Sequence, residues 1–303
     1  MMTIPPPPAG GPRVTAPVPL RFEDVTQDGR LVLEALPNAV APTLWRGVLA
    51  GSEAARALRA QGIVPVLTRL RLEGTAGPFS TSAVVEAEAS LRFARADDGR
   101  FMLDMWADLY GPLGRTYGGR GAAGSRHGER ILAGRVLSEH VLTRPFAPSG
   151  QRRVTDLDFP GAPTVTATRP ALPPFESIAT LPEGARPLEP APRPDGLPVS
   201  FGLVHTDSNH HVNSLVYLRL VEEAALRRFV ALGRGSEWLA RTVDIAYRKP
   251  CFAGQTIRVV HQAYESGGAL GVAAVIVPEA GAAAGEDVAG VRPHAYVRMG
   301  FET

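Results

Sequence analysis

The spacing of apolar residues in positions 199–303 predicts one long helix followed by several strands. Val199–Val204 is a short apolar run typical of a strand. From about Val212 to Leu232, apolar positions recur every three or four residues, which predicts a largely buried helix ending near Gly233. Further strands are expected at Thr242–Tyr247, Thr256–Tyr264, Leu270–Val277 and Ala295–Phe301. This order indicates an antiparallel sheet wrapped around a helix, an α+β architecture.

Positions 18–142 repeat this order of elements. Arg30–Leu36 is typical of a strand, and Thr43–Ala60 of a helix that ends at Gly62. Strands are expected at Val66–Leu72, Val84–Phe93 and Phe101–Tyr110. Short matches accompany the common order, such as Glu53-Ala54-Ala55 with Glu223-Ala224-Ala225, and the segment at Thr68 with the segment at Thr242. The sequence therefore predicts an internal duplication.

Proline marks the boundaries of the two regions. Residues 1–17 contain the run Pro5-Pro6-Pro7-Pro8 and are expected to be a disordered N-terminus. Residues 143–198 are crowded with proline, which lacks the N–H that a central strand needs, so they are expected to form a connector of loops and edge pieces. The N-terminal region is then 18–142 and the C-terminal region 199–303.

Composition excludes several classes of protein. The 303 residues are 45% hydrophobic, too apolar for a disordered chain, and the net charge of +2 predicts no nucleic-acid partner. No apolar run is long enough to insert into a membrane, and the single cysteine, Cys251, fits a cytoplasmic protein. No paired Cys/His spacing predicts a metal site. The run Gly118–Gly124 lacks the Lys-Ser/Thr of a phosphate-binding loop, so no cofactor is expected.

The chemistry-bearing residues gather where the first strand of the second region enters its helix. Asp207, Asn209 and His211 alternate there, so their side chains could converge on one pocket. The start of a helix offers free N–H groups and partial positive charge, which could stabilise the oxyanion formed when a thioester is attacked. The carboxylate could act as a general base on water or as a nucleophile. Asp207 could also simply cap the helix.

These residues resemble the active site of hotdog-fold acyl thioesterases. The family pattern is an aspartate, a histidine four residues later in His-Val-Asn-Asn, and a helical tyrosine; here Asp207, the run His211-Val212-Asn213-Ser214 and Tyr217 follow it. The run from Asp207 to His211 is also similar to the Asp-x-Asn-x-His motif of plant-type acyl-carrier-protein thioesterases, which are double hotdogs. Bacterial 4-hydroxybenzoyl-CoA thioesterase-like proteins share the simpler pattern.

The next strand carries a second point of resemblance and a departure. Tyr247-Arg248-Lys249-Pro250-Cys251 followed by Gly254 is similar to the family's tyrosine–arginine segment. The plant-type family has a catalytic glutamate before the cysteine, where Pro250 stands here. The resemblance then implies that Asp207 is the main catalytic group, as in the simpler bacterial enzymes. The specific resemblance covers about Val199 to Gly254.

The resemblance implies a double hotdog that hydrolyses acyl thioesters of coenzyme A or acyl carrier protein in fatty acid metabolism. It implies that the catalytic residues are Asp207, Asn209 and His211, and that the substrate-binding residues are Asn213, Tyr217, Arg248 and Lys249. In the first half, the counterpart of Asp207 is expected near Pro37, where neither acid nor histidine lies. This implies one active site per chain, with the first half supplying walls of the acyl pocket. The resemblance is also compatible with a homodimer of such chains.

Two other functions are compatible with these residues. A hotdog hydratase or dehydratase also uses Asp, Asn and His, but its motif places a proline after the asparagine and the histidine five residues from the aspartate. Here His210 follows Asn209. A non-catalytic acyl-binding protein is the alternative suggested by Pro250 and by the degenerate first half. Acyl chain length, and the choice between coenzyme A and carrier protein, do not follow from residue spacing.

Overall fold

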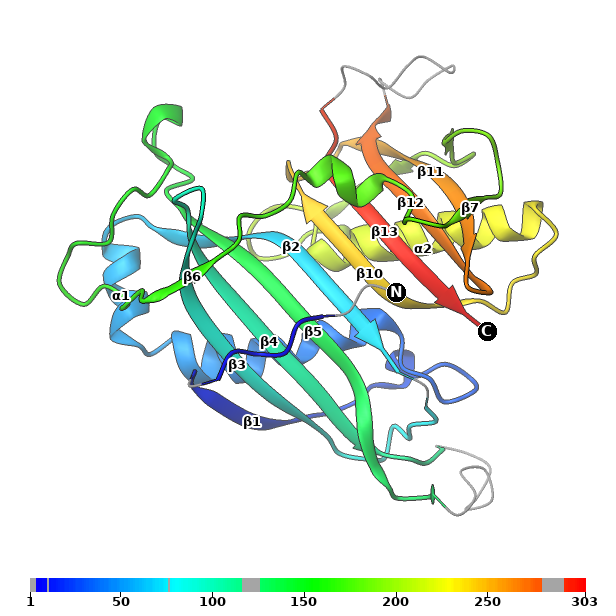
Figure 1. Ribbon diagram of the computed structural model, residues 1–303, viewed down its shortest axis with the longest axis horizontal. Coiled ribbons are helices and arrows are strands. Elements are labelled where there is room, and N and C mark those ends of the chain that lie inside the picture. The colour runs from blue at the N-terminus through cyan, green and yellow to red at the C-terminus, as the bar shows by residue number, and fades with distance from the viewer. Residues whose placement is uncertain (1–3, 10, 76, 116–125, 280–291) are drawn as a thin grey trace. The chain divides into compact units, whose positions relative to one another are not determined.

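The computed structural model describes residues 4–9, 11–75, 77–115, 126–279 and 292–303. It divides into two compact units, Met1–Leu172 (unit 1) and Pro173–Thr303 (unit 2), shown in Figure 1. The boundary falls inside the predicted connector, so residues 143–172 belong to unit 1 and residues 173–198 to unit 2. The glycine-rich run Gly118–Gly124 lies outside the described residues.

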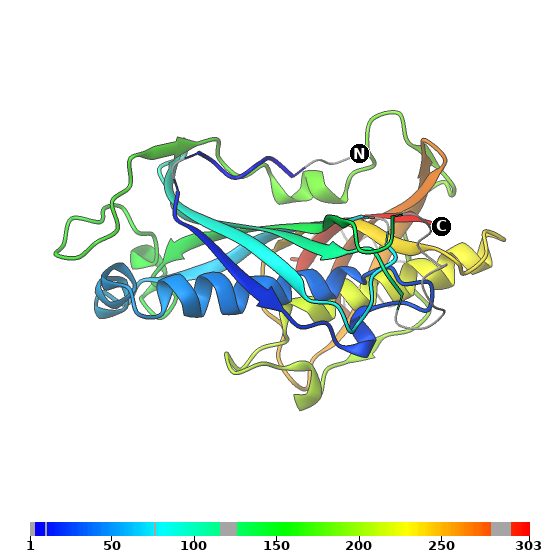
Figure 2. The ribbon, with the colours of Figure 1, turned by 90° about the horizontal axis from the view of Figure 1, so that it is seen from below.

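Unit 1 is an antiparallel sheet with helical segments on one face (Figure 2). Its strands are β1 Arg13–Val18, β2 Val64–Gly74, β3 Val85–Ala96, β4 Phe101–Pro112, β5 Arg130–Thr143 and the short β6 Ala167–Arg169. Their order is β1-β3-β4-β5-β2, and β6 pairs in parallel with β3. The helical segments are the 3-10 helices Phe22–Asp24, Leu33–Ala39 and Ser149–Gln151, the π-helix Ala41–Leu49 and α1 Glu53–Ala60.

Unit 2 is built around one long helix, α2 Ser214–Ala231, which contacts β11, β12 and β13. Its main strands are β10 Leu239–Tyr247, β11 Thr256–Ser266, β12 Ala269–Pro278 and β13 Ala295–Glu302, in the order β10-β13-β12-β11. Three two-residue strands, β7 Arg186–Pro187, β8 Arg193–Pro194 and β9 Val199–Ser200, pair with β11. The 3-10 helices are Phe175–Ala179 and Leu203–His205. The proline-rich connector thus contributes short strands at sheet edges and two 3-10 helices.

The predicted helix of unit 2 forms because one of its faces is apolar and both of its ends carry stop signals. Asn213 caps the N-terminus, its side-chain oxygen accepting a hydrogen bond from the Leu215 N–H at 2.9 Å. Gly233 takes the left-handed backbone (φ 71°) that ends the helix. The buried face comprises Tyr217, Leu218, Val221, Ala224, Ala225 and Phe229. The predicted helix is confirmed, but it is buried on this face only, because Arg219, Glu223, Val230 and Ala231 are exposed.

The two units have the same strand topology. In each, the strand after the helical segment pairs with the last strand, the last with the middle one, and the middle one with the first of the three. The post-helix strand carries a bulge in both units, at Thr68 in β2 and at Arg241 in β10. This common topology supports the predicted duplication, and each unit has the α+β architecture.

Several predicted elements differ from the structure in unit 1. The strand Arg30–Leu36 is wrong, because Leu33–Ala39 is a 3-10 helix. The helix Thr43–Ala60 is broken into the π-helix Ala41–Leu49 and α1, which starts anew at the cap Ser52. Residues 13–17, expected to be disordered, lie in β1 and pair with β3. The sequence did not predict β5.

In unit 2, the predicted strand Val199–Val204 is strand only over its first two residues. The chain turns there into the 3-10 helix Leu203–His205, and Leu203 and Val204 are exposed. Apolar character therefore did not indicate burial at these two positions, because the turn directs both side chains outward.

Candidate active site

The predicted motif forms a tight turn immediately before α2. The Asp207 N–H donates to the His211 carbonyl at 3.1 Å, and the His210 N–H donates to the Asp207 carbonyl at 3.0 Å. A β-bridge between Thr206 and Val212 closes the base of the turn. His210 takes a left-handed backbone (φ 63°), rare for a residue other than glycine, and this lets the chain reverse. We call residues 207–211 the unit 2 loop.

The side chains of the unit 2 loop keep much of their polar capacity open. One Asp207 oxygen, Oδ1, accepts the Asn209 N–H at 2.8 Å, and no hydrogen bond to Oδ2 is found among the described residues. The His211 Nδ1 lies 3.9 Å from Asp207 Oδ1, close enough for electrostatic attraction but too far for a hydrogen bond. The side chains of His211 and Asp207 are 39% and 26% exposed. Both groups can therefore still meet a substrate.

The start of α2 offers fewer free donors than a helix N-terminus does in general. The Leu215 and Val216 N–H groups both donate to Asn213, to its side chain and its carbonyl. The Asn213 N–H donates to the carbonyl of His205, at 2.9 Å. Ser214 is then the first-turn residue whose N–H has no acceptor among the described residues. The backbone amides that remain as possible oxyanion donors are therefore the Ser214 N–H and its neighbours in the turn.

Tyr217 lies below the loop, on the buried face of α2. Its hydroxyl accepts the Cys251 N–H at 2.9 Å, and the Cys251 carbonyl accepts the Val212 N–H at 2.8 Å. The ring packs edge-on against Tyr247, whose hydroxyl donates to the Ser214 carbonyl. Burial raises the pKa of both tyrosines, so both hydroxyls stay protonated. These contacts give Tyr217 the geometry of a brace between the loop, the helix and the end of β10.

Cys251 has the environment of a packed residue rather than a nucleophile. It is fully buried, and burial raises the pKa of its thiol to about 11, although the Tyr217 hydroxyl and Lys249 act in the opposite direction. Since the thiolate is the reactive form, the thiol is inert at neutral pH. Pro250, which stands where the plant-type family has its glutamate, is exposed beside it.

Arg248 and Lys249 are exposed at the end of β10. Their backbone N–H groups both donate to the His294 carbonyl, at 2.8 and 3.2 Å. The Arg248 guanidinium lies over the Phe175 ring, 5.4 Å from its centroid. No hydrogen bond or ion pair joins either cation to Asp207 among the described residues; the segment meets the end of the loop through Cys251, whose carbonyl accepts the Val212 N–H.

Sequence reasoning missed part of the loop's support and its apolar rim. From the sequence, His205 is an exposed or pairing histidine without an assigned role; in the structure its Nδ1 accepts the Gly202 N–H at 2.9 Å, and its carbonyl accepts the Asn213 N–H. Leu203, Val204 and Phe252 are exposed by 81%, 90% and 44%. Segments 201–206 and 251–255 are joined by backbone hydrogen bonds. Leu203 and Val204 lie in an apolar run that predicts a strand, so no signal in the sequence marks them as exposed.

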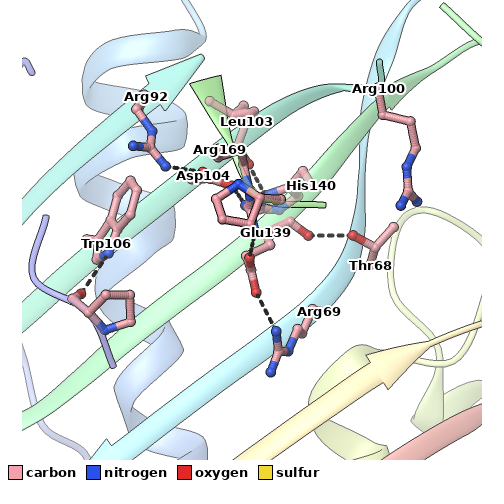
Figure 3. Close-up of polar contacts among 12 residues, drawn as sticks. Thr68, Arg69, Arg92, Arg100, Leu103, Asp104, Trp106, Glu139, His140 and Arg169 are labelled. Carbon is pink, nitrogen blue, oxygen red and sulfur yellow. Dashed lines mark hydrogen bonds and ion pairs between the residues drawn. The ribbon is translucent and has the colours of Figure 1, made fainter. Parts of the chain in front are cut away.

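A second polar cluster, in unit 1, was also not predicted (Figure 3). Five charged residues from five strands form it, and we call it the unit 1 charge cluster: Arg69, Arg92, Asp104, Glu139 and Arg169. The first four lie in one row, because Arg92 pairs with Asp104, Asp104 with Glu139, and Glu139 with Arg69 in the strand register. Arg169 of β6 reaches both carboxylates at 2.5 Å. The carboxylates and guanidinium groups bind one another, which is the arrangement of a structural cluster.

No group of three or more His, Cys, Asp or Glu residues able to hold a metal ion is present in the described part of the chain. Within the same residues, no helix is long and apolar enough to cross a bilayer.

Comparison with known proteins shows the fold. No family model and no curated protein matches the sequence. Among solved structures, a protein described as an oleoyl thioesterase from Lactobacillus plantarum superimposes with a TM-score of 0.62 at 14% identity, over 97% of this chain and 96% of that chain. The 12:0-ACP thioesterase from Umbellularia californica gives 0.56 at 14% identity, over 96% and 97%.

An acyl-ACP thioesterase from Bacteroides thetaiotaomicron gives a TM-score of 0.57 at 13% identity, over 96% of this chain and 98% of that chain. At such identities the likeness establishes the fold and not the activity. The chain therefore has a hotdog-like thioesterase fold, and the resemblance inferred from Asp207, His211 and Tyr217 is confirmed at the level of fold.

Proposed function

We propose that this chain is a double hotdog that hydrolyses acyl thioesters at the unit 2 loop. The observation that carries the proposal is the Asp207 carboxylate, half-buried with one oxygen held by the Asn209 N–H and the other without a protein donor among the described residues. The similarity in fold to three thioesterase structures supports it. The substrate class is an acyl thioester of coenzyme A or acyl carrier protein in the cytoplasm.

The proposed reaction uses Asp207 as general base or as nucleophile. As a base, it removes a proton from water, whose oxygen attacks the thioester carbonyl carbon. The carbonyl oxygen becomes an oxyanion, which the Ser214 N–H at the start of α2 would stabilise. The C–S bond then breaks, the sulfur takes the proton from Asp207, and a carboxylic acid and a thiol leave. Asn209 and His211 would orient the water and the carbonyl group.

Arg248 and Lys249 would bind the thiol-bearing half of the substrate. Both are exposed cations shortly before Cys251, which is bonded to Val212 beside the loop, and coenzyme A and the carrier-protein prosthetic arm both carry phosphate. The exposed apolar side chains of Leu203, Val204 and Phe252 would be available to contact the acyl chain. Asn213 and Tyr217 would act mainly by holding the helix start in place.

The test is thiol release by the purified full-length chain, measured over acyl-CoA and acyl-carrier-protein thioesters of graded chain length. Asp207→Asn keeps the shape of the side chain and removes the base, so turnover should fall by about 10²–10⁴-fold. Ser208→Ala is the matched control, since Ser208 is exposed in the same loop and makes no hydrogen bond among the described residues. Equal rates for wild type and Asp207→Asn would refute the proposal.

A non-catalytic acyl-binding protein is the second candidate, and Pro250 favours it. A proline cannot replace the glutamate that activates water in plant-type enzymes. Saturable binding of acyl thioesters without thiol release, at every chain length, would establish this alternative. Including enoyl thioesters in the same screen, with hydration followed by absorbance, separates a hydratase from both.

A further inference from the structure

Unit 1 contains a segment that follows the same backbone path as the unit 2 loop and its flanks. In both units a three-residue 3-10 helix leads into a β-bridge, a tight turn, the second half of the bridge and then the helical segment. The corresponding parts are Phe22–Asp24 with Leu203–His205, and the bridge Val25–Leu31 with the bridge Thr206–Val212. Each flanking 3-10 helix also exposes its first residue, Phe22 in one unit and Leu203 in the other.

The hydrogen bonds of the two segments agree one by one. In unit 1 they are Thr26 N–H to Arg30 carbonyl (2.8 Å), Gly29 N–H to Thr26 carbonyl (2.9 Å), and Val32 N–H to Asp24 carbonyl (3.1 Å). In unit 2 they are Asp207 N–H to His211 carbonyl (3.1 Å), His210 N–H to Asp207 carbonyl (3.0 Å), and Asn213 N–H to His205 carbonyl (2.9 Å). The side chains of Asp24 and His205 each accept the N–H three residues earlier, at 2.9 Å.

The turn residue with positive φ also matches, Gly29 (φ 90°) with His210 (φ 63°). The counterpart of Asp207 is therefore Thr26. This corrects the expectation that placed it near Pro37, which lies in the 3-10 helix Leu33–Ala39. In the same register, Asp28 corresponds to Asn209 and Arg30 to His211. We call residues 26–30 the unit 1 loop.

The side chains of the unit 1 loop bind one another, unlike those of the unit 2 loop. The Thr26 hydroxyl donates to Asp28 Oδ1 at 2.5 Å, and Arg30 Nε donates to Asp28 Oδ2 at 2.7 Å. The Arg30 N–H lies 3.1 Å from Thr26 Oγ1 and 3.3 Å from Asp28 Oδ1. Burial raises the pKa of Asp28, but these hydrogen bonds and the Arg30 charge outweigh it and the net shift is downward. The Asp28 carboxylate is thus ionised, its charge is neutralised by Arg30, and both of its oxygens already accept hydrogen bonds.

We propose that the unit 1 loop is a second acyl-thioester site that has been silenced by two changes: the base at position 26 became a threonine, and Asp28 and Arg30 neutralise each other where Asn209 and His211 stand. The proposal rests on the proposed function of the unit 2 loop. It assigns the unit 1 loop the same class of substrate and predicts that hydrolysis can be rebuilt there.

The structure limits which residues a rebuilt site needs to change. Gly29 must remain, because a Cβ atom there would lie 2.5 Å from the Cβ of Pro78 and the backbone is left-handed. Thr26, Asp28 and Arg30 are all partly exposed, as Asp207 and His211 are, so the new side chains have access to solvent. The rebuilt loop is therefore Thr26→Asp, Asp28→Asn and Arg30→His.

The test uses the full chain carrying Asp207→Ala, so that the unit 2 loop is inactive. Adding Thr26→Asp, Asp28→Asn and Arg30→His should raise thiol release by about 10²-fold over the Asp207→Ala background, the low end of what a positioned acid–base group contributes. The control carries Asp28→Asn and Arg30→His without the new carboxylate, and it should stay at background. A folded triple variant, verified by circular dichroism, that stays at background overturns the proposal.

A second experiment tests the silencing step in case the triple variant does not fold. Asn209→Asp with His211→Arg, in a chain that keeps Asp207, copies the unit 1 ion pair into the unit 2 loop. Thiol release should fall by about 10²-fold or more. Full activity of this folded variant would overturn the silencing mechanism. The two proposals are distinguishable: inactive wild type refutes the proposed function and with it this one, whereas active wild type with no rebuilt activity refutes this one alone.

Discussion

Arg169→Met should strongly destabilise unit 1, because this residue neutralises two buried carboxylates. Asp104 and Glu139 are 1% and 2% exposed, and the Arg169 side chain is 12% exposed. Its two contacts are both 2.5 Å long (Figure 3). Removing the guanidinium leaves two neighbouring carboxylates facing each other across β4 and β5, with the remaining charge compensation coming from Arg92 and the more distant Arg69.

The magnitude follows from burial more than from distance. At an effective dielectric constant of about 20, each contact has a gross Coulomb energy of about 7 kcal/mol, most of which offsets the cost of removing the charges from water. Breaking a buried pair by removing one partner typically costs about 3–5 kcal/mol, and we expect that loss in the free energy of unfolding. With an m-value of about 2 kcal/mol/M, the urea midpoint should fall by about 2 M.

The chain provides a matched control at the same distance. Arg186 contacts Glu265 at 2.5 Å, but the two side chains are 64% and 30% exposed, and Glu265 also contacts Arg234. Arg186→Met should therefore cost less than about 1 kcal/mol. Urea denaturation followed by circular dichroism measures both variants, and hydrogen exchange in β4 and β5 localises the effect. Equal losses for Arg169→Met and Arg186→Met would refute the reasoning from burial.

Three further predictions concern single side chains. Burial lowers the pKa of His140 to about 4 from its ordinary 6.5, so the unfolded chain takes up this proton first and the His140 contribution to stability is complete above pH 6.5 and lost as the pH falls toward 4. The fall in unfolding free energy from pH 8 to pH 5 should be smaller in His140→Gln by roughly 2 kcal/mol; identical pH profiles would contradict this. Cys251 should react with thiol reagents only after unfolding, and rapid labelling of the native chain at pH 8 would show its burial to be wrong. Tyr217→Phe leaves the Cys251 N–H without its acceptor, so we expect a loss of about 1–3 kcal/mol in chemical denaturation; an unchanged midpoint would mean that the hydroxyl does not brace the loop.

The sequence predicted unit 2 well because its apolar periods are long and undisturbed. The helix expected over Val212–Leu232 is observed as Ser214–Ala231, and the four strands differ from their predicted bounds by a few residues at their ends. Burial of one face fixes a 3.6-residue period over eighteen residues, and no competing turn signal interrupts it. The residues of the unit 2 loop could be singled out as candidates because positions 207–211 are adjacent in the sequence.

The helical segment of unit 1 could not be predicted in the same way. The segment that follows the unit 1 loop, as α2 follows the unit 2 loop, is 33–49, where Pro37 and Pro42 remove backbone donors and the chain takes 3-10 and π-helical turns. The better helical period lies further on, in α1. The match between Glu53-Ala54-Ala55 and Glu223-Ala224-Ala225 is therefore out of register.

The two polar sites of unit 1 could not be predicted from the sequence, for two different reasons. The unit 1 charge cluster joins residues that are adjacent only through strand register, such as Arg92 with Asp104 and Arg69 with Glu139. The unit 1 loop shares its backbone with the unit 2 loop but none of the five residues at corresponding positions. Hydrogen bonds between main-chain atoms define that turn, so its side chains were free to change.

The close approach of Gly29 to Pro78 means that the two loops differ in how many substitutions they tolerate. At the corresponding place in unit 2, His210 is exposed and shows that a side chain fits, although its left-handed backbone (φ 63°) disfavours β-branched residues. In unit 1, any side chain larger than hydrogen at position 29 would collide with Pro78. Mutational drift can therefore continue to explore position 210, whereas position 29 is fixed until Pro78 itself moves. After a duplication, such a contact makes the two copies differ in their tolerance to mutation. The copy whose turn is closely packed accepts fewer substitutions there, and the copy whose turn is open accepts more.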